Sequence, residues 1–421
     1  MTVAPERVSA NHWPGLDVVP SGPRARASAA VARRLMKSAV NRLDVSLVVG
    51  DETWGKGGPE AVVHRTDEFF ARVGRHQLIG FGEAYQAGAW DADDLGGFLE
   101  VLASEIQDLV PRSLQKMRAL VVKRPPRTQR SSKKHSQDNI AHHYDLSNDL
   151  FQTFLDPTLT YSCALFEGEP TAAGAADLEA AQGRKIERLL DEAGVGEGSR
   201  VLEIGSGWGE LCIRAARRGA TITSVTLSTE QKALGDQRVA AAAERDGFDA
   251  GQVSIELCDY RDVQGTYDAI VSVEMIEAVG WQYWRTYFET IDRVLAPGGK
   301  VAVQAITMPH DRMLATRNTY TWINKYIFPG GFLPSVQVID QITRDHTSLR
   351  MAEPFSMGQH YARTLTLWDE AFLASSERVL ELGFDEVFLR MWHFYLEYSR
   401  AGFASGYIDV NQLTFSREAT S

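Results

Sequence analysis

The second half of the chain alternates between two hydrophobic patterns. Apolar residues at helical spacing predict helices over residues 175–193, 209–218, 228–246 and 281–295. Short apolar runs between them predict strands over residues 200–204, 221–227, 253–257, 267–273 and 300–306. This alternation predicts an α/β fold with a Rossmann-like, doubly wound sheet and helices on both faces. The segment APGGK, residues 296–300, predicts a turn before the last strand.

The rest of the chain departs from this alternation. Residues 21–120 predict a smaller N-terminal α+β domain, which follows a flexible tail over residues 1–20. Within that domain we expect helices over 27–42 and 93–110, strands over 43–49 and 60–64, and turns at the glycines of 78–90. Prolines, serines and basic residues predict a linker over 121–138. Residues 139–421 then form the α/β domain, with an aromatic-rich insertion at about 309–359 that we expect over the substrate end of the sheet.

Composition narrows the class of protein. The chain has 421 residues and a formal net charge of −11, which argues against nonspecific binding of nucleic acid. Its three cysteines show neither a disulfide framework nor metal-ligand spacing, which fits a reducing cytoplasm. We see no signal peptide and no apolar run of membrane-spanning length, so we expect a cytoplasmic protein that is soluble or peripheral to a membrane.

One short segment breaks the acidic balance. Residues 112–134 carry nine Lys or Arg and no acidic residue. Such a run is typical of a solvated tether, and it is also typical of a contact with anionic lipid. The sequence leaves both interpretations open.

The string VLEIGSGWGE, residues 201–210, is the strongest candidate for a binding site. It predicts a strand, a turn containing Gly205, Gly207 and Gly209, and the start of a helix. Glycines let a ligand approach the backbone, and a helix start offers N–H groups without partners. The same string is also compatible with an ordinary strand-to-helix turn that binds no ligand. The spacing G-x-G-x-G differs from the dinucleotide-binding G-x-G-x-x-G, and Glu203 precedes it where a carboxylate can meet a cationic ligand.

Three further strings accompany this turn in a fixed order. They are NIAHHYDLSNDLFQTFLDPTLTYSCALFE (139–167), VSVEMIEAVG (271–280) and HYARTLTLW (360–368). Together with the turn they resemble the motifs of the cyclopropane fatty acid synthase family of S-adenosylmethionine (SAM) methyltransferases. From Pro20 onward the chain looks closest to the actinobacterial branch that makes tuberculostearic-type 10-methyl fatty acids. HHYD by itself could suggest a metal, but no paired carboxylate or cysteine completes a site, so we predict none.

The resemblance implies a class I SAM methyltransferase fold and a set of residues that contact SAM. Tyr161 and Ser162 match positions beside SAM, together with the glycine turn. Thr226 and Gln231 match the segment beside the ribose. Asp259, after the third strand, is a candidate near the adenine, and a helix cap is the equally ordinary interpretation.

The resemblance also implies a bound bicarbonate ion as the base. It places the backbone of Cys163, the side chain of Glu277, the backbone of Ile306 and the side chain of Tyr361 at four of five bicarbonate-binding positions. At the fifth position this chain has Gln304 where the best-known members have histidine. A glutamine can donate a hydrogen bond to an anion but carries neither a charge nor a transferable proton. The familiar histidine after the glutamate is also missing, because residue 278 is alanine.

These features together predict a SAM-dependent enzyme that methylates the cis double bond of an unsaturated acyl chain in a membrane phospholipid. We expect a methylene-branched product, a precursor of 10-methyl fatty acids that a separate reductase would have to complete. The alternatives are a cyclopropane synthase proper, a methyltransferase for a small amine or phenol, and a degenerate lipid-binding module. Such an enzyme would work as a peripheral protein at the inner membrane surface, and the sequence leaves open whether it is a homo-oligomer.

Overall fold

The computed structural model describes residues 8–105 and 147–417. The predicted linker over 121–138 and the start of the first family string therefore lie outside the described residues. The chain divides into two compact units. Unit 1 comprises residues 1–123, 320–325 and 365–407, and unit 2 comprises the remainder. Unit 1 thus takes in two segments from the region that the sequence analysis gave to the α/β domain.

Unit 2 is built on an eight-stranded sheet. Seven strands follow the order β10-β12-β9-β8-β5-β6-β7, and β11 pairs with β12. Their bounds are β5 Arg200–Ile204, β6 Thr221–Thr226, β7 Val253–Leu257, β8 Tyr267–Val273, β9 Leu295–Thr307, β10 Leu349–Met351, β11 Phe355–Ser356 and β12 Asp409–Arg417. The five strands from β9 to β7 are parallel, and β12 is antiparallel to β9. The predicted doubly wound, Rossmann-like α/β sheet is confirmed.

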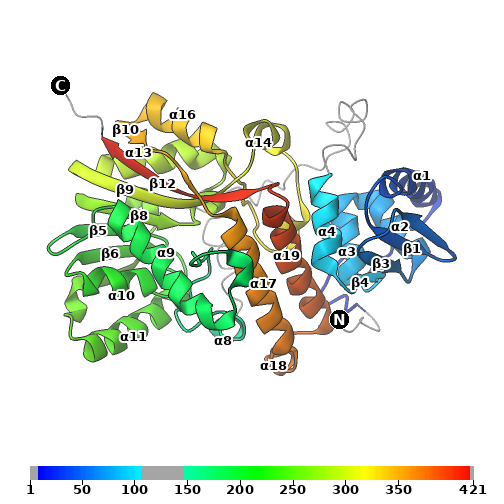
Figure 1. Cartoon of the computed structure of the whole chain (residues 1–421), viewed down its shortest axis with the longest axis horizontal. Coiled ribbons are helices and arrows are strands. Elements are labelled where there is room, and N and C mark those ends of the chain that lie inside the picture. Colours follow the sequence, from blue (N-terminus) through cyan, green and yellow to red (C-terminus); the bar gives the residue numbers. More distant parts are fainter. Residues whose placement is uncertain (1–7, 106–146, 418–421) are drawn as a thin grey trace. The chain divides into compact units, whose positions relative to one another are not determined.

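Helices cover both faces of this sheet (Figure 1). The helices α9 (Leu178–Glu192), α10 (Glu210–Arg217) and α11 (Thr229–Asp246) pack on one face, and α13 (Trp284–Val294) and α16 (Val336–His346) pack on the other. Along β5, Val201 joins the core under the first group of helices, while Leu202 and Ile204 join the core under the second. Because successive strand residues point to opposite faces, one short apolar run serves two cores.

Shorter helices connect these elements. In unit 2 they are α8 (Asn148–Phe151), α12 (Ile276–Val279) and α14 (His310–Thr316), with 3-10 turns at 170–172, 175–177, 250–252, 260–262 and 281–283. The boundaries between the two units fall inside two helices, α15 (Trp322–Tyr326) and α17 (Gly358–Ala374), so each of these helices contains residues of both units. The predicted insertion at 309–359 therefore consists largely of α14, α15, α16, β10 and β11. Its place over a bound substrate stays a prediction.

Unit 1 holds a four-stranded sheet in the order β2-β1-β3-β4. Its elements are α1 Pro23–Val40, β1 Ser46–Val49, β2 Glu52–Gly55, β3 Glu60–Val63, α2 Thr66–His76, α3 Leu78–Gln86, β4 Trp90–Ala92, α4 Leu95–Ser104, α18 Ser376–Glu381 and α19 Glu386–Ala404. The helix α19 packs on α3 and α4. Its buried Arg390 donates hydrogen bonds to the carbonyls of Tyr85 and Trp90 and pairs with Asp91.

Two predictions of turns were wrong. The glycines of 78–90 lie mostly in the helix α3, where the absence of a side chain lets neighbouring segments pack closely against the helix. A Cβ on Gly80 would lie 2.0 Å from the carbonyl oxygen of Arg72, and one on Gly82 would lie 2.6 Å from the ring of Trp322. The segment 296–300 lies inside β9, which pairs with β8 on both sides of a register irregularity. Residues 295 and 300 pair with residues 267 and 269 of β8, so the residues between them form a bulge within the strand rather than a turn before it.

Two candidate features are absent from the described residues. None of the helices in 8–105 and 147–417 is long and apolar enough to cross a membrane. Within the same ranges, no group of three His, Cys, Asp or Glu side chains could hold a metal ion.

Candidate active site

The glycine turn lies between β5 and α10, as predicted. Gly205, Gly207 and Gly209 have φ values of 95°, 48° and 88°, which are in the left-handed region that favours glycine. A Cβ on Gly205 would lie 2.4 Å from the side chain of Met275. A Cβ on Gly207 would meet nothing within 4 Å, so this glycine faces open space. The turn thus leaves room for a ligand at Gly207, beside the start of α10.

Glu203 lies beneath this turn, in β5. Its carboxylate is buried and accepts hydrogen bonds from Ser224 Oγ at 2.6 Å and Cys212 Sγ at 3.0 Å. Burial raises the pKa of Glu203 to about 7. The structure gives this carboxylate protein partners, and its contact with a cationic ligand stays a prediction.

The other predicted SAM contacts lie at the carboxyl ends of neighbouring strands. Thr226 ends β6, and its hydroxyl donates to Gln231 Oε1 at 3.0 Å. Asp259 follows β7 and accepts a hydrogen bond from the backbone N–H of Arg261, whose guanidinium it also pairs with. Asp259 is therefore a cap of the short 3-10 turn at 260–262. The carboxyl ends of parallel strands are the usual ligand edge of such a sheet.

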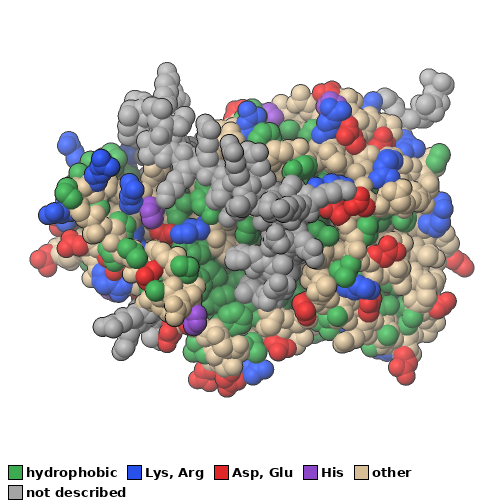
Figure 2. Space-filling view, turned by 180° about the vertical axis from the view of Figure 1, so that it is seen from behind, with side chains coloured by type: hydrophobic (Ala, Val, Ile, Leu, Met, Phe, Trp, Pro, Cys, Tyr) green, Lys and Arg blue, Asp and Glu red, His purple; other side chains and the backbone are tan. Residues whose placement is uncertain are grey.

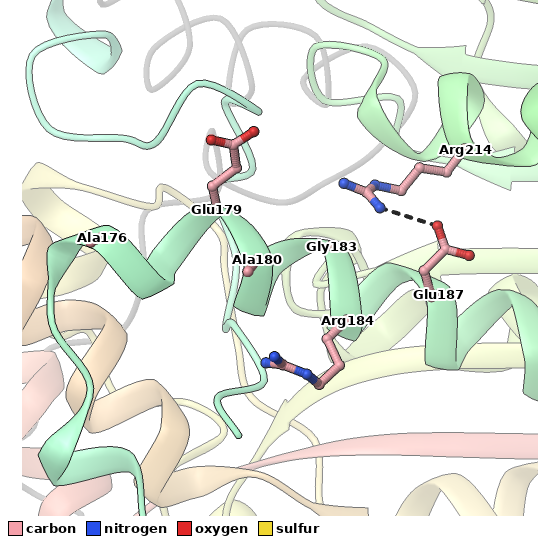
Figure 3. Close-up of a pocket in the computed structure, with 7 residues that line it drawn as sticks. All are labelled: Ala176, Glu179, Ala180, Gly183, Arg184, Glu187 and Arg214. Carbon is pink, nitrogen blue, oxygen red and sulfur yellow. Dashed lines mark hydrogen bonds and ion pairs between the residues drawn. The ribbon is translucent and has the colours of Figure 1, made fainter. Parts of the chain in front are cut away.

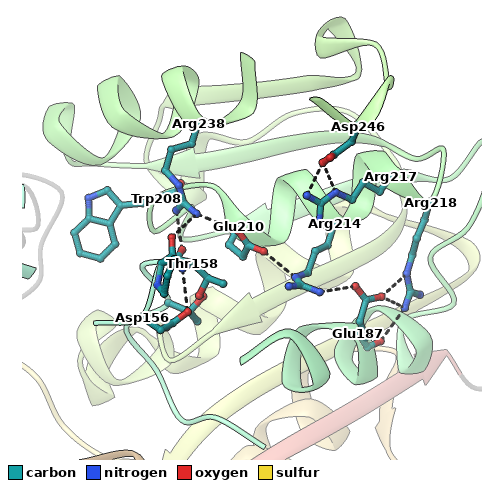
Figure 4. Close-up of polar contacts among 12 residues, drawn as sticks. Asp156, Thr158, Glu187, Trp208, Glu210, Arg214, Arg217, Arg218, Arg238 and Asp246 are labelled. Carbon is teal, nitrogen blue, oxygen red and sulfur yellow. Dashed lines mark hydrogen bonds and ion pairs between the residues drawn. The ribbon is translucent and has the colours of Figure 1, made fainter. Parts of the chain in front are cut away.

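A strap over residues 147–166 is held on the glycine turn by side chains (Figure 4). Arg238 of α11 donates hydrogen bonds to the carbonyls of Thr158 at 2.7 Å and Trp208 at 3.0 Å, and pairs with Glu210. The ring N–H of Trp208 donates to Asn148 at 2.8 Å. Phe151 packs against the rings of both Trp208 and Tyr161. These contacts position the strap that carries Tyr161 and Ser162.

Sequence reasoning did not select Arg238 or Trp208 as site residues. Trp208 lies within the glycine string itself, so its position was a usable signal. Arg238 lies about 30 residues further on, in a helix of ordinary composition. Only the packing of α11 against the strap reveals that it reaches backbone carbonyls on both sides of the turn.

All five predicted base-site residues come together in unit 2. Glu277 Oε1 accepts a hydrogen bond from the backbone N–H of Ile306 at 2.5 Å. The other three meet at Glu274, the residue after β8, which the sequence analysis did not select. Its carboxylate accepts from Cys163 N at 3.0 Å, from Gln304 Nε2 at 2.8 Å and from the Tyr361 hydroxyl at 2.7 Å. The signal was a second acidic residue in VSVEMIEAVG, three positions before Glu277.

This cluster carries strongly perturbed ionisable groups. Burial, followed by the nearby charge of Glu274, raises the pKa of Glu277 to about 8. Burial also raises the pKa of Glu274, against the effect of its three hydrogen bonds. Lys185 of α9 is fully buried and donates to Ser162 Oγ at 2.6 Å. Burial lowers the pKa of Lys185 to about 8, while Glu274 opposes that shift.

A bicarbonate ion does not fit the site as the resemblance implies. Three of its five predicted contacts, Cys163, Gln304 and Tyr361, already bind the carboxylate of Glu274. A second anion among the same groups would lie beside a buried carboxylate without donors of its own, which is costly. Three of the donors that the resemblance assigns to bicarbonate are therefore used by Glu274 in this structure, and a bicarbonate-binding role for the five residues stays a prediction.

A surface pocket lies elsewhere in unit 2, along α9 (Figure 3). Its lining includes Glu187 and Arg214, which form an ion pair at 3.1 Å. None of the predicted cofactor or base-site residues lines this pocket, so we assign it no part in the site.

Comparison with known proteins decides the family. Residues 131–413 match the model of the family described as mycolic acid cyclopropane synthetase. The chain belongs to this family. Among its members, the tuberculostearic acid methyltransferase UfaA1 of Mycobacterium tuberculosis is 55% identical over 98% of this chain and 96% of its own. The cyclopropane-fatty-acyl-phospholipid synthase of Escherichia coli K12 is 35% identical over 85% of this chain and 88% of its own.

A solved structure of the family supports the same placement. The mycolic acid cyclopropane synthase CmaA1, crystallised with S-adenosylhomocysteine (SAH) and CTAB, superposes with a TM-score of 0.59 at 30% identity. The match covers 69% of this chain and 98% of CmaA1. That family member therefore binds the product form of SAM on the fold described here.

The open space at Gly207 generates the first prediction. Gly207→Ala places a methyl group where a ligand approaches the turn, and we expect SAM affinity to fall by on the order of tenfold, about 1.4 kcal/mol. The matched control is Gly247→Ala, because Gly247 also has a left-handed φ and open space around its Cβ but caps the far end of α11. Calorimetric titration with SAM measures both variants. Equal SAM affinity in the two would contradict the cofactor site.

Arg238 generates the second prediction. Arg238→Gln removes charge-assisted hydrogen bonds to the strap, each worth about 1.5–3 kcal/mol. We expect the Kd for SAM to rise by on the order of tenfold or more, because the strap no longer holds Tyr161 and Ser162 over the turn. Arg245→Gln on the same helix is the control, since the side chain of Arg245 is 65% exposed and forms an ion pair with Asp246, away from the strap. If both variants bind SAM like the parent, the strap does not form part of the SAM site.

Proposed function

We propose that this protein uses SAM to methylate the cis double bond of an unsaturated acyl chain in a phospholipid and releases a methylene-branched chain. The observation that carries the proposal is the 55% identity, over nearly the whole chain, to a tuberculostearic acid methyltransferase. The glycine turn and the carboxyl cluster support it because they are close together. The side chain of Met275 lies beside Gly205 of the turn, and Met275 directly follows Glu274 of the cluster.

The residues around this cluster suit the chemistry of an alkene. SAM supplies an electrophilic methyl group, and an alkene that accepts it becomes a carbocation. The chain must then keep water away and provide a base. Glu274 and Glu277 are partly buried residues, and desolvation raises the pKa of both carboxyl groups. Tyr361 and Gln304 fix the position of the first. A small amine or phenol loses its proton before or during methyl transfer, whereas the cation formed from an alkene loses a proton only afterwards and must be kept from water until then.

A methylene product requires a further reduction to become a methyl branch. The described residues include one glycine turn of the nucleotide-binding type, at 205–209, and it serves SAM in this proposal. The reduction therefore falls to a separate reductase.

The product generates the third prediction. Purified protein with SAM and oleoyl phospholipid, but without a reductant, should yield a chain with an exocyclic methylene group. Methylene and cyclopropane chains have the same mass, so the fatty acid methyl esters are separated by retention time and assigned by proton NMR. Upfield ring protons without an alkene signal at the branch would instead identify a cyclopropane synthase. Recovery of unchanged oleate from an otherwise SAM-binding protein would point to the degenerate lipid-binding module.

Access to a phospholipid implies a peripheral position at the inner membrane surface. Two basic segments could make the contact. One is the run at 123–134, outside the described residues, and the other is α1, whose exposed side chains include Arg24, Arg26 and Arg34. Figure 2 shows Lys and Arg side chains gathered where α1 lies. Neither segment contains an acidic residue, and we assign the contact to the run at 123–134 because it adjoins the start of the catalytic region, whereas Arg33 and Lys37 of α1 already pair with Glu52.

This assignment generates the fourth prediction. Replacing Lys123, Arg124, Lys133 and Lys134 with Gln should weaken binding to vesicles containing anionic phosphatidylglycerol, by about 1 kcal/mol per charge near the surface. The loss should shrink as salt increases. The matched control removes four charges from and beside α1, at Arg24, Arg26, Arg34 and Arg42. Cosedimentation over a salt series compares the two. A loss confined to the α1 variant would move the contact to unit 1.

A further inference from the structure

The side chain of Glu274 occupies the position that the family resemblance reserves for an external anion. Oε1 accepts hydrogen bonds from the Cys163 backbone and the Gln304 amide, and Oε2 accepts one from the Tyr361 hydroxyl. These donors come from the strap, from β9 and from α17, so three separate parts of unit 2 converge on one carboxylate. A carboxylate and a bicarbonate ion present the same pair of oxygen acceptors to such donors.

The backbone of Glu274 gives independent support. Its φ is 51°, one of three positive φ values among non-glycine residues in the described structure. A glycine would adopt this conformation without cost, whereas a residue with a Cβ is strained there. The backbone N–H of Glu274 donates to the carbonyl of Gln304 at 2.8 Å, which holds the residue in this conformation. Strained backbone of this kind is concentrated at functional sites.

The charged groups around Glu274 balance a single negative charge. Lys185 is the buried cation whose charge acts on Glu274. Glu277 has its pKa raised to about 8 and therefore keeps its proton at neutral pH. Glu274 has three hydrogen-bond donors on its carboxylate, and it is the member of the pair that carries the negative charge. A bicarbonate ion would add a second charge with no second cation among these neighbours.

We propose that the carboxylate of Glu274 is the general base of this enzyme and replaces bicarbonate. The inference rests on the proposed function, because it concerns the cation left after methyl transfer. A hydride shift from the methyl-bearing carbon moves the positive charge onto that carbon. One C–H bond of the added methyl group then breaks, its electron pair forms the new C=C bond, and the proton passes to Oε2 of Glu274. The neutral methylene chain leaves, and the proton returns to solvent before the next turnover.

The neighbours of Glu274 act as positioning residues in this scheme. The Cys163 N–H and the Gln304 amide hold Oε1, and the Tyr361 hydroxyl leaves Oε2 with a lone pair for the proton. Gln304 suits this task better than a histidine would, because its amide stays neutral and keeps a donor toward the carboxylate at any pH. The glutamine at position 304, where the familiar pattern has histidine, therefore goes together with the glutamate at position 274, because the one donates a hydrogen bond to the other.

The first test removes bicarbonate from the unaltered protein. Transfer of labelled methyl from SAM to oleoyl phospholipid is measured in carbon-dioxide-free buffer, with and without added bicarbonate. We expect the same rate in both. A rate that collapses on depletion and recovers with bicarbonate would overturn the inference while leaving the proposed function in place. Absence of label transfer under every condition would overturn the proposed function, and the inference with it. This test requires no variant and so does not depend on folding.

The second test changes the base itself. Glu274→Gln should lower the rate by on the order of 10²–10⁴-fold, the usual contribution of a general base, with unchanged SAM affinity by calorimetry. Glu274→Gly opens the anion position, and we expect added bicarbonate or formate to restore part of its rate. The control is Glu289→Gln, a partly exposed glutamate on α13 that pairs with Arg285. Turnover by Glu274→Gln at the rate of the parent would remove Glu274 from the chemistry.

Discussion

A carboxylate buried without partners is one of the most costly groups that a protein core can hold. The arrangement around Glu274 meets this constraint with two hydrogen bonds to one oxygen, one to the other, and the charge of Lys185 nearby. Each partner comes from a different element, so the strap, β9, α9 and the start of α17 must all be in place. The arrangement of these four elements around the site is therefore constrained by the need to give the Glu274 carboxylate its partners.

The glycine turn and the carboxyl cluster are neighbours because of the order of the strands. The strands β5 and β8 pair in parallel, and both end at the same edge of the sheet. The turn follows β5 and Glu274 follows β8, so topology alone brings the predicted methyl-donor site and the proposed base to one edge. The Ser272 hydroxyl, which donates to the carbonyl of Ile204 at 2.9 Å, links the two strand ends directly.

The strap connects the glycine turn to Glu274, and so links the predicted cofactor site to the proposed base. Its first part is held on the turn by Arg238 and Trp208, and its last part supplies the Cys163 N–H to Glu274. Between them lie Tyr161 and Ser162, the predicted SAM contacts. Any change that loosens the strap therefore affects both the cofactor site and the orientation of the base, which gives a physical reason for the close spacing of these residues along the chain.

The sequence by itself determined the sheet and the position of the turn. The strands β5, β7 and β8 have the predicted bounds, because hydrophobic runs between helices are local patterns. The motif strings also identified the family, and the five residues that they selected for the base site lie at Glu274 and Glu277 in the structure. Tertiary structure decided the remainder. The glycines at 80 and 82 allow close packing, and residues 296–299 form a bulge within β9, which pairs with β8 on both sides of them. The role of Glu274 depends on donors up to 111 residues away along the chain, and no local pattern records such a convergence.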